Sequence, residues 1–246
     1  MLSEQEVRTF RRDGFLGPFD LADRDLAETV LTEAVHDLGF TEAVADLHPR
    51  HILGRHKGAP LVRANAHLTS EAVMRLGRDP AILRRLACLM GPDIYLRRSQ
   101  FWRKPPQARG VIWHQDIHRK LGLGDIGELS AWVALEDATI DNGCVWLSRG
   151  SHVQGAVEAS SVVSPGFRIR FFASDKVEIP EPLLGYEAAP MEVRKGQFFL
   201  FHQLCFHASG PNRSDGARTG VALRYLSDPD IPSVTEQLTQ VWPEAA

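Results

Sequence analysis

The sequence predicts a mainly β protein, a sandwich or barrel of strands with helices in front of it. Short segments rich in β-branched and aromatic residues recur after residue 90, among them DIYLRRSQFW, LSAWVALED and RTGVALRYL. Turn-forming stretches such as KPP, DNG and SGPNRSDG separate these segments. Many short strands divided by such turns are typical of all-β sandwiches and barrels.

The N-terminal third, about residues 1–90, has helical signals instead. Ser3 and Glu6 can form a capping box, and Gly14 can end that short helix. Asp79 suits the N-cap of a later helix that Gly91 would end. The segment that follows Leu21 has helical apolar spacing as well.

These patterns divide the chain without splitting it into separate domains. We expect a helical part over about 1–90, a β core over about 91–230, and an insertion or lid over about 155–190. The sequence has no internal repeat and no low-complexity linker. A single domain over residues 1–246 is therefore the expectation, and the chain is long enough for one sizeable core.

Composition excludes several classes of partner. The net charge is -3 and the basic residues are spread along the chain, which argues against nucleic acid or an anionic membrane surface. No apolar run approaches membrane-spanning length. Three cysteines without a C-x-x-C pattern, and a charged N-terminus without a signal-peptide core, favour a reduced, cytoplasmic protein.

A metal site is indicated by GVIWHQDIH. On a strand, His114 and Asp116 would point to the same face, and together they are two-thirds of the facial triad that binds non-haem Fe(II). His207, in a later β-type segment, is the candidate third ligand. Taken singly, each side chain has a more ordinary role as a satisfied polar residue, a turn cap or a buried histidine; together, in a β context, they favour the metal.

A cosubstrate site is indicated by the arginine that follows. Arg218 lies eleven residues after His207 on the next expected strand, where its planar fork could hold the far carboxylate of 2-oxoglutarate. Ser209 could donate a further hydrogen bond. Arg224, of the same strand parity, is the alternative anchor. An isolated Arg218 would more often form a surface salt bridge.

At this point the sequence resembles the phytanoyl-CoA dioxygenase family of Fe(II)/2-oxoglutarate oxygenases. The matching pieces are WHQD, DNGCVWLSRGSH and HASGPNRSDGARTGVALRY, and they occur in the family's order. The resemblance implies a double-stranded β-helix, a cupin-like jelly roll with helices packed outside. It also implies His114, Asp116 and His207 as catalytic iron ligands, Arg218 and Ser209 as 2-oxoglutarate contacts, and O2 as the second cosubstrate.

Within the family, the chain is most similar in style to a branch that contains carrier-protein-dependent halogenases. Those enzymes replace the carboxylate ligand with a small residue, whereas this chain keeps Asp116. The resemblance therefore implies hydroxylation rather than chlorination. The family's usual Pro in the following turn is Arg149 here, which puts a cation near the expected site.

Several further residues are candidates for substrate contact. Gln100, Trp102 and Arg98 share one face of an expected strand, and Trp146 could line the cavity or belong to the core. His118 shares strand parity with the metal residues; substrate contact and an exposed position in a loop are equally good interpretations. Arg98, Gln100 and Arg149 would suit a polar or anionic substrate.

The expected function is hydroxylation of an unactivated C–H in a small polar metabolite. An amino acid, free or tethered to an acyl or peptidyl carrier protein, or another natural-product intermediate is the leading substrate. Desaturation, epoxidation or epimerisation by the same cofactors is one alternative, and a non-catalytic jelly-roll binding protein is another. A monomer or a homodimer is expected.

Overall fold

The structure is a computed structural model and describes residues 1–36, 41–42, 60–116, 127–156, 171–172, 185–229 and 237–243. Its helical elements are α1 (Glu4–Asp13), α2 (Asp25–His36), α3 (Glu71–Gly77), α4 (Pro80–Met90) and the short 3₁₀ turns η2 (Ala66–Leu68) and η4 (Ser151–Gln154). Its strands are β1 (Phe15–Asp20), β2 (Thr41–Glu42), β3 (Leu61–Ala64), β4 (Ile94–Lys104), β5 (Gly110–His114), β6 (Leu129–Ala134), β7 (Val145–Ser148), β8 (Phe171–Phe172), β9 (Ala188–Met191), β10 (Gln197–His202), β11 (His207–Ser209), β12 (Arg218–Leu226) and β13 (Thr239–Trp242).

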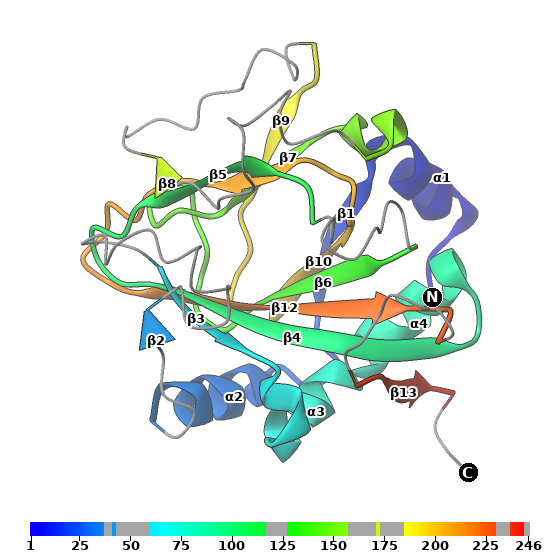
Figure 1. The fold of residues 1–246 in the computed structure, drawn as a ribbon, viewed down its shortest axis with the longest axis horizontal. Coiled ribbons are helices and arrows are strands. Elements are labelled where there is room, and N and C mark those ends of the chain that lie inside the picture. The colour runs from blue at the N-terminus through cyan, green and yellow to red at the C-terminus, as the bar shows by residue number, and fades with distance from the viewer. Residues whose placement is uncertain are drawn as a thin grey trace.

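These strands form two antiparallel sheets. The larger has the order β1-β10-β6-β12-β4-β3-β2, with β13 paired to β4. The smaller has the order β8-β5-β11-β7-β9 and lies across from the larger one (Figure 1). Strands that are far apart in the sequence are thus neighbours, as in the pairs β12–β4 and β11–β5. The mainly β, jelly-roll fold expected from the sequence is confirmed.

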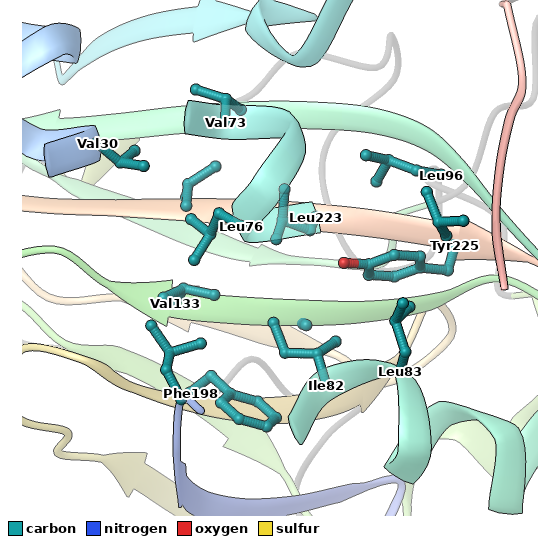
Figure 2. Packing of buried hydrophobic residues seen from close by; sticks show 14 of the residues in the cluster. Val30, Val73, Leu76, Ile82, Leu83, Leu96, Val133, Phe198, Leu223 and Tyr225 are labelled. Carbon is teal, nitrogen blue, oxygen red and sulfur yellow. The ribbon is translucent and has the colours of Figure 1, made fainter. Parts of the chain in front are cut away.

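Helices cover the outer face of the larger sheet. In Figure 1, α2 and α3 lie on the side of β4 that faces away from the smaller sheet. Successive side chains of β12 point to opposite faces of the sheet, so every second side chain of this strand points toward the helices. Figure 2 shows side chains from helices α2, α3 and α4 packed against strands β4, β6, β10 and β12; it labels Val30, Val73, Leu76, Ile82, Leu83, Leu96, Val133, Phe198, Leu223 and Tyr225.

The predicted helix signals are confirmed. Ser3 and Glu6 form a reciprocal capping box, and Gly14 ends α1 with a positive φ of 81°. Asp79 caps α4 by accepting hydrogen bonds from the backbone N–H groups of Ala81 and Ile82. The Asp79 carboxylate also accepts from the backbone of Ala22 and so joins α4 to the segment before α2.

The N-terminal part is less purely helical than expected. Residues Phe15–Asp20 form β1, which pairs with β10 at the edge of the larger sheet, and Leu61–Ala64 form β3, which pairs with β4. Both segments are short and irregular in polarity, so only pairing with a distant strand makes them extended. None of the helices in the described ranges is long and apolar enough to cross a membrane.

The insertion or lid expected over about 155–190 lies mostly outside the described residues. Within it, β8 pairs with β5 and β9 pairs with β7, so the described pieces form the two edge strands of the smaller sheet. The single-domain organisation stays a prediction.

Candidate metal and cosubstrate site

Three side chains meet between the two sheets. His114 ends β5 and His207 begins β11, and the two residues are direct partners in the strand pairing. Asp116 Oδ1 lies 3.9 Å from His114 Nε2, and Asp116 Oδ2 lies 3.8 Å from His207 Nε2. One ligand atom from each of the three lies within 4.8 Å of the other two. The predicted cluster is therefore assembled by the fold.

Asp116 reaches the cluster differently from the expectation. Strand β5 ends at His114, so Asp116 does not share a strand face with it. Instead, the Asp116 N–H donates to the Gln203 carbonyl oxygen at 2.9 Å, and the Gln115 side chain donates to the Leu204 carbonyl oxygen at 2.8 Å. These bonds tie the segment after β5 to the turn between β10 and β11, which places the carboxylate beside the histidines.

The histidine ring of His207 is fixed in a state suited to a metal. Its Nδ1 lies 3.0 Å from the Cys205 carbonyl oxygen, which can only accept, so Nδ1 carries the hydrogen and Nε2 keeps its lone pair. Burial, and secondarily the nearby His114, lower the pKa of His207 to about 4. The ring is therefore neutral at neutral pH, as a metal ligand must be.

The carboxylate ligand has its own partner, Arg224. An Arg224 guanidinium N–H donates to Asp116 Oδ1 at 2.9 Å, and both side chains are buried. Behind them, Arg97 and Glu128 form a second buried ion pair. Burial raises the pKa of Glu128, and the charges of Arg97 and Arg224 oppose that rise. The alternative cosubstrate anchor of the sequence analysis thus contacts an expected metal ligand.

The other end of the cavity is cationic. Arg218, at the start of β12, is 1% exposed and donates to the backbone carbonyl of Gly143. Its guanidinium carbon lies 5.4 Å from the centre of a Trp132 ring. Lys104, its partner across the β12–β4 pair, is equally buried and donates to Ser209 Oγ at 2.8 Å. Arg218 and Ser209 both line the same cavity, and Lys104 pairs with the one and donates to the other.

One cavity joins these two ends. It is lined by the three metal-ligand candidates, by the basic side chains of Lys104, Arg218 and Arg224, and by the hydroxyl group of Ser209. The other lining residues are Trp102, Val111, Trp132, Val145, Phe201, Ala208 and Ala222. Nitrogen and carboxylate ligands at one end match the donor set of a non-haem Fe(II) site with open positions. Cations at the far end match the distal carboxylate of a bound 2-oxo acid.

The remaining substrate candidates are distributed more widely. Trp102 lines the cavity, and Gln100 and Arg98 are the partners of Ala222 and Arg224 across the β4–β12 pair. Trp146 packs between two apolar clusters and is not among the residues that line the cavity. Arg149 forms ion pairs with Asp13 and Glu187 instead of lining it. His118 lies outside the described residues.

Sequence reasoning missed Lys104. A signal for it was present, because Lys104 has the same strand parity as Gln100 and Trp102, which were selected as cavity residues. The structure adds Asn212, whose amide donates to the carbonyl oxygens of Lys104, Pro105 and Gly216. Asn212 thereby joins the end of β4 to the loop before β12.

This combination of fold and site defines a class. A jelly roll with two histidines and a carboxylate at one end of a cavity, and buried cations at the other, is the arrangement of an Fe(II)/2-oxoglutarate-dependent oxygenase. The residues fit both groups: three possible ligand atoms lie within 4.8 Å of one another, and the buried cations Lys104 and Arg218 line the same cavity.

Comparison with known proteins identifies the family. A profile of phytanoyl-CoA dioxygenase (PhyH) matches residues 10–220, and the chain belongs to this family. The L-proline trans-4-hydroxylase of Streptomyces griseoviridis is 27% identical over 250 residues, covering 94% of this chain and 89% of that protein. Phytanoyl-CoA dioxygenase domain-containing protein 1 of Mus musculus is 32% identical over 126 residues, a match that spans 50% of this chain and only 38% of the mouse protein.

A solved structure supports the same assignment. The nickel complex of the non-haem monooxygenase ThoJ is 30% identical, with a TM-score of 0.63, and the match covers 90% of this chain and 76% of that one. The chain is therefore a non-haem iron dioxygenase that uses Fe(II), 2-oxoglutarate and O2. The non-catalytic alternative from the sequence analysis is set aside.

Proposed function

We propose that this enzyme hydroxylates an unactivated C–H bond of a small polar metabolite. An amino acid, either free or tethered to a carrier protein, is the leading substrate class. The observation that carries the proposal is Asp116, whose carboxylate lies at the metal cluster and is held there by Arg224. A carboxylate in this position occupies the ligand site that a halide would otherwise take, which favours oxygen insertion over halogenation.

Each residue of the site has a defined task. His114, Asp116 and His207 would hold the iron, and Cys205 fixes the His207 tautomer through its carbonyl oxygen. Arg218 would bind the far carboxylate of 2-oxoglutarate, and Gly143 orients that arginine. When bound, the iron and 2-oxoglutarate would react with O2 to supply an oxidant strong enough to remove a hydrogen atom from carbon. The apolar wall, which includes Val111, keeps bulk water from this oxidant.

The substrate class rests on a relative and on the cavity. The relative that matches over nearly the full length of both chains is named as a hydroxylase of L-proline, an amino acid. Trp102 lines the cavity and offers an aromatic wall for a small substrate. Gln100 and Arg98 precede it at alternate positions of β4. Arg98 and Gln100 would suit the carboxylate and amide groups of an amino acid or of its tethered form.

The iron site is tested first and without a substrate. Fe(II) and then 2-oxoglutarate are added to the metal-free protein without oxygen, and the visible charge-transfer band of the iron–oxoglutarate chelate is measured. The band is expected in the wild type and absent in His207→Ala. A folded wild-type protein that gives no band at saturating Fe(II) and 2-oxoglutarate would contradict the proposed role.

The reaction is tested by product mass. Succinate release is measured with free amino acids and with the same amino acids loaded on a carrier protein, and the products are analysed by mass spectrometry. Hydroxylation and epoxidation of an alkene each add one oxygen atom, so these two are distinguished by whether the product keeps the alkene. Desaturation removes two hydrogens, and epimerisation leaves the mass unchanged. A product without the added oxygen would overturn hydroxylation in favour of desaturation or epimerisation, and a product that has lost an alkene would favour epoxidation.

A further inference from the structure

A buried ion pair lies behind the metal end of the cavity. Arg97 Nε donates to Glu128 Oε2 at 2.6 Å, and a second guanidinium nitrogen of Arg97 contacts the same oxygen. Arg97 is 2% exposed and Glu128 is 0% exposed, and neither is among the residues that line the cavity. Burying two charges costs about as much as their attraction returns, so such a pair is weak evidence for a role in stability.

A β-bulge in β4 directs Arg97 into this pair. The register of β4 against β12 shifts between Leu96 and Arg98, so Arg97 is the extra residue. In a regular strand, Arg97 would have the parity of Phe101, which packs in the core beneath the helices. Bulges are frequent next to active sites, where they re-aim a side chain. Here the bulge lets the guanidinium of Arg97 reach Glu128.

Hydrogen bonds tie Glu128 to the segment that carries Asp116. The Glu128 N–H donates to Gln203 Oε1 at 3.1 Å, and the Gln203 N–H donates to the Glu128 carbonyl oxygen at 3.1 Å. The Gln203 carbonyl oxygen accepts from the Asp116 N–H at 2.9 Å. A single residue, Gln203, therefore connects the backbone of Glu128 to that of the expected metal ligand.

Strand register places Glu128 on the same side of the sheet as Arg224. Arg224 of β12 is the direct partner of Ser130 of β6. Glu128 precedes Ser130 by two residues, and residues two apart in an extended segment point to the same face. Trp132, two residues further on, lines the cavity, so this is the inner face of the larger sheet.

The charges at this end of the cavity alternate in sign. Arg97 pairs with Glu128, and Arg224 pairs with Asp116. Burial raises the pKa of Glu128, the positive charges of Arg97 and Arg224 oppose that rise, and the negative charge of Asp116 adds to it. Glu128 therefore lies within electrostatic reach of both the metal ligand and the arginine that binds it.

We propose that Glu128 is a positioning residue for the metal site. Held by Arg97 and Gln203, its buried negative charge keeps Arg224 in the orientation from which that arginine binds Asp116. This inference rests on the proposed function, in which Asp116 is an iron ligand. It assigns the ion pair to metal binding instead of to the stability of the fold, so the two properties should respond differently when the pair is removed.

The test replaces the whole ion pair. Arg97→Met with Glu128→Met fills the site with apolar side chains, and exchanges of this kind are often neutral or stabilising. The melting temperature of the metal-free double variant is expected to equal or exceed that of the wild type. Its Kd for Co(II), titrated without oxygen, is expected to rise about 10-fold. The visible d–d band of bound Co(II), which reports ligand geometry, is expected to shift.

A second ion pair provides a matched control. Arg103 Nη1 of β4 lies 3.6 Å from Glu136 Oε2, just after β6, and neither residue is among those that line the cavity. Arg103→Met with Glu136→Met is expected to bind Co(II) with the wild-type Kd and band position. Glu128→Gln removes the charge alone and is expected to raise the Kd by the same factor, so it tests the proposal if the double Met variant does not fold.

A further pair of variants tests whether Glu128 acts through Arg224. In an Arg224→Gln background, Glu128→Gln is expected to change the Kd for Co(II) by less than about 2-fold, because residues that act as a unit are not additive. A further loss of about 10-fold there, a wild-type Kd in the folded double Met variant, or equal weakening in the control pair would overturn the positioning role. Absence of Co(II) binding to the wild-type protein would instead overturn the metal site itself.

Discussion

Arg224 shows how one side chain can set the properties of a metal ligand. It is buried beside Asp116 and donates to Oδ1, which orients the carboxylate toward the histidines. Partners of this kind fix the orientation of metal ligands, and their loss commonly weakens metal binding. The arginine thus belongs to the metal end of the cavity, although its strand also carries the cosubstrate anchor.

Replacing Arg224 by Gln is expected to weaken Co(II) or Fe(II) binding by about 10- to 100-fold. The physical reason is that Asp116 loses its charged partner and its fixed orientation. Metal affinity is measured by titration without oxygen, with Arg103→Gln as the matched control on β4. Wild-type affinity in a folded Arg224→Gln protein would show that Asp116 is positioned without this arginine.

His207 makes the stability of the metal-free protein depend on pH. Its pKa is about 4 when folded, because of burial, against about 6.5 for an unperturbed histidine. Between these two pH values the unfolded chain binds the proton and the folded chain does not. The free energy of unfolding therefore rises as pH increases through this window, and acid lowers it.

Urea unfolding of the metal-free protein at pH 5 and pH 7 tests this expectation. Wild type should lose about 2 kcal/mol more than His207→Gln when the pH falls from 7 to 5, by linkage from the folded and unfolded pKa values. The variant corrects for other groups that titrate in the same range. Equal losses in the two proteins would mean that His207 does not resist protonation in the fold.

Strand β12 links the helical layer to the cavity through its alternation. Val221, Leu223 and Tyr225 pack into the core beneath the helices, while Arg218, Ala222 and Arg224 line the cavity. Gly220 lies on the cavity side and has no side chain. A Cβ there would lie 2.1 Å from Cζ2 of Trp132, so the glycine makes space for the indole that packs near Arg218.

Gly220→Ala is therefore expected to displace Trp132 toward the cosubstrate end of the cavity. The variant should show a lower melting temperature and weaker 2-oxoglutarate binding, because the indole and Arg218 share that space. Both are measured with metal-loaded protein. Gly216→Ala is the control, since a Cβ at Gly216 meets nothing within 4 Å. A Gly220→Ala protein equal to this control in both measurements would contradict the expectation.

The metal and cosubstrate site exists only in the folded protein, because its groups come from both sheets. Ligands that bind this site should therefore stabilise the whole fold against unfolding. The metal ligands come from β5, β11 and the segment after β5, and the cations come from β4 and β12. An unfolded chain cannot present these groups together. Binding energy at the site is therefore added to the free energy of unfolding.

A metal and 2-oxoglutarate, each at about 100 times its Kd, should each add about 2.7 kcal/mol. Each addition corresponds to a rise in melting temperature of roughly 5 to 10 °C for a chain of this size. The measurement is thermal unfolding with Co(II), without oxygen, with and without 2-oxoglutarate. His207→Ala should lose most of the shift caused by the metal, and a full shift in that variant would indicate binding elsewhere.

Much of this protein follows from patterns that are local in the chain. Capping residues such as Ser3 and Asp79 act within one helical turn, so the two helix starts were predictable. The bounds of β12 follow from its alternation and from the turn before it. The metal and cosubstrate residues were recognisable because the required residue types recur at a set spacing, as in His207 and Arg218.

What the chain could not reveal depends on contacts between residues far apart in sequence. The pairing of Lys104 with Arg218, the bond from Arg224 to Asp116 and the bond from His207 to the Cys205 carbonyl all require the register of the sheets or the path of a turn. Strand parity leaves several residues equally eligible for each role. The fold selects among them, because only in three dimensions do burial and distance decide which charges meet.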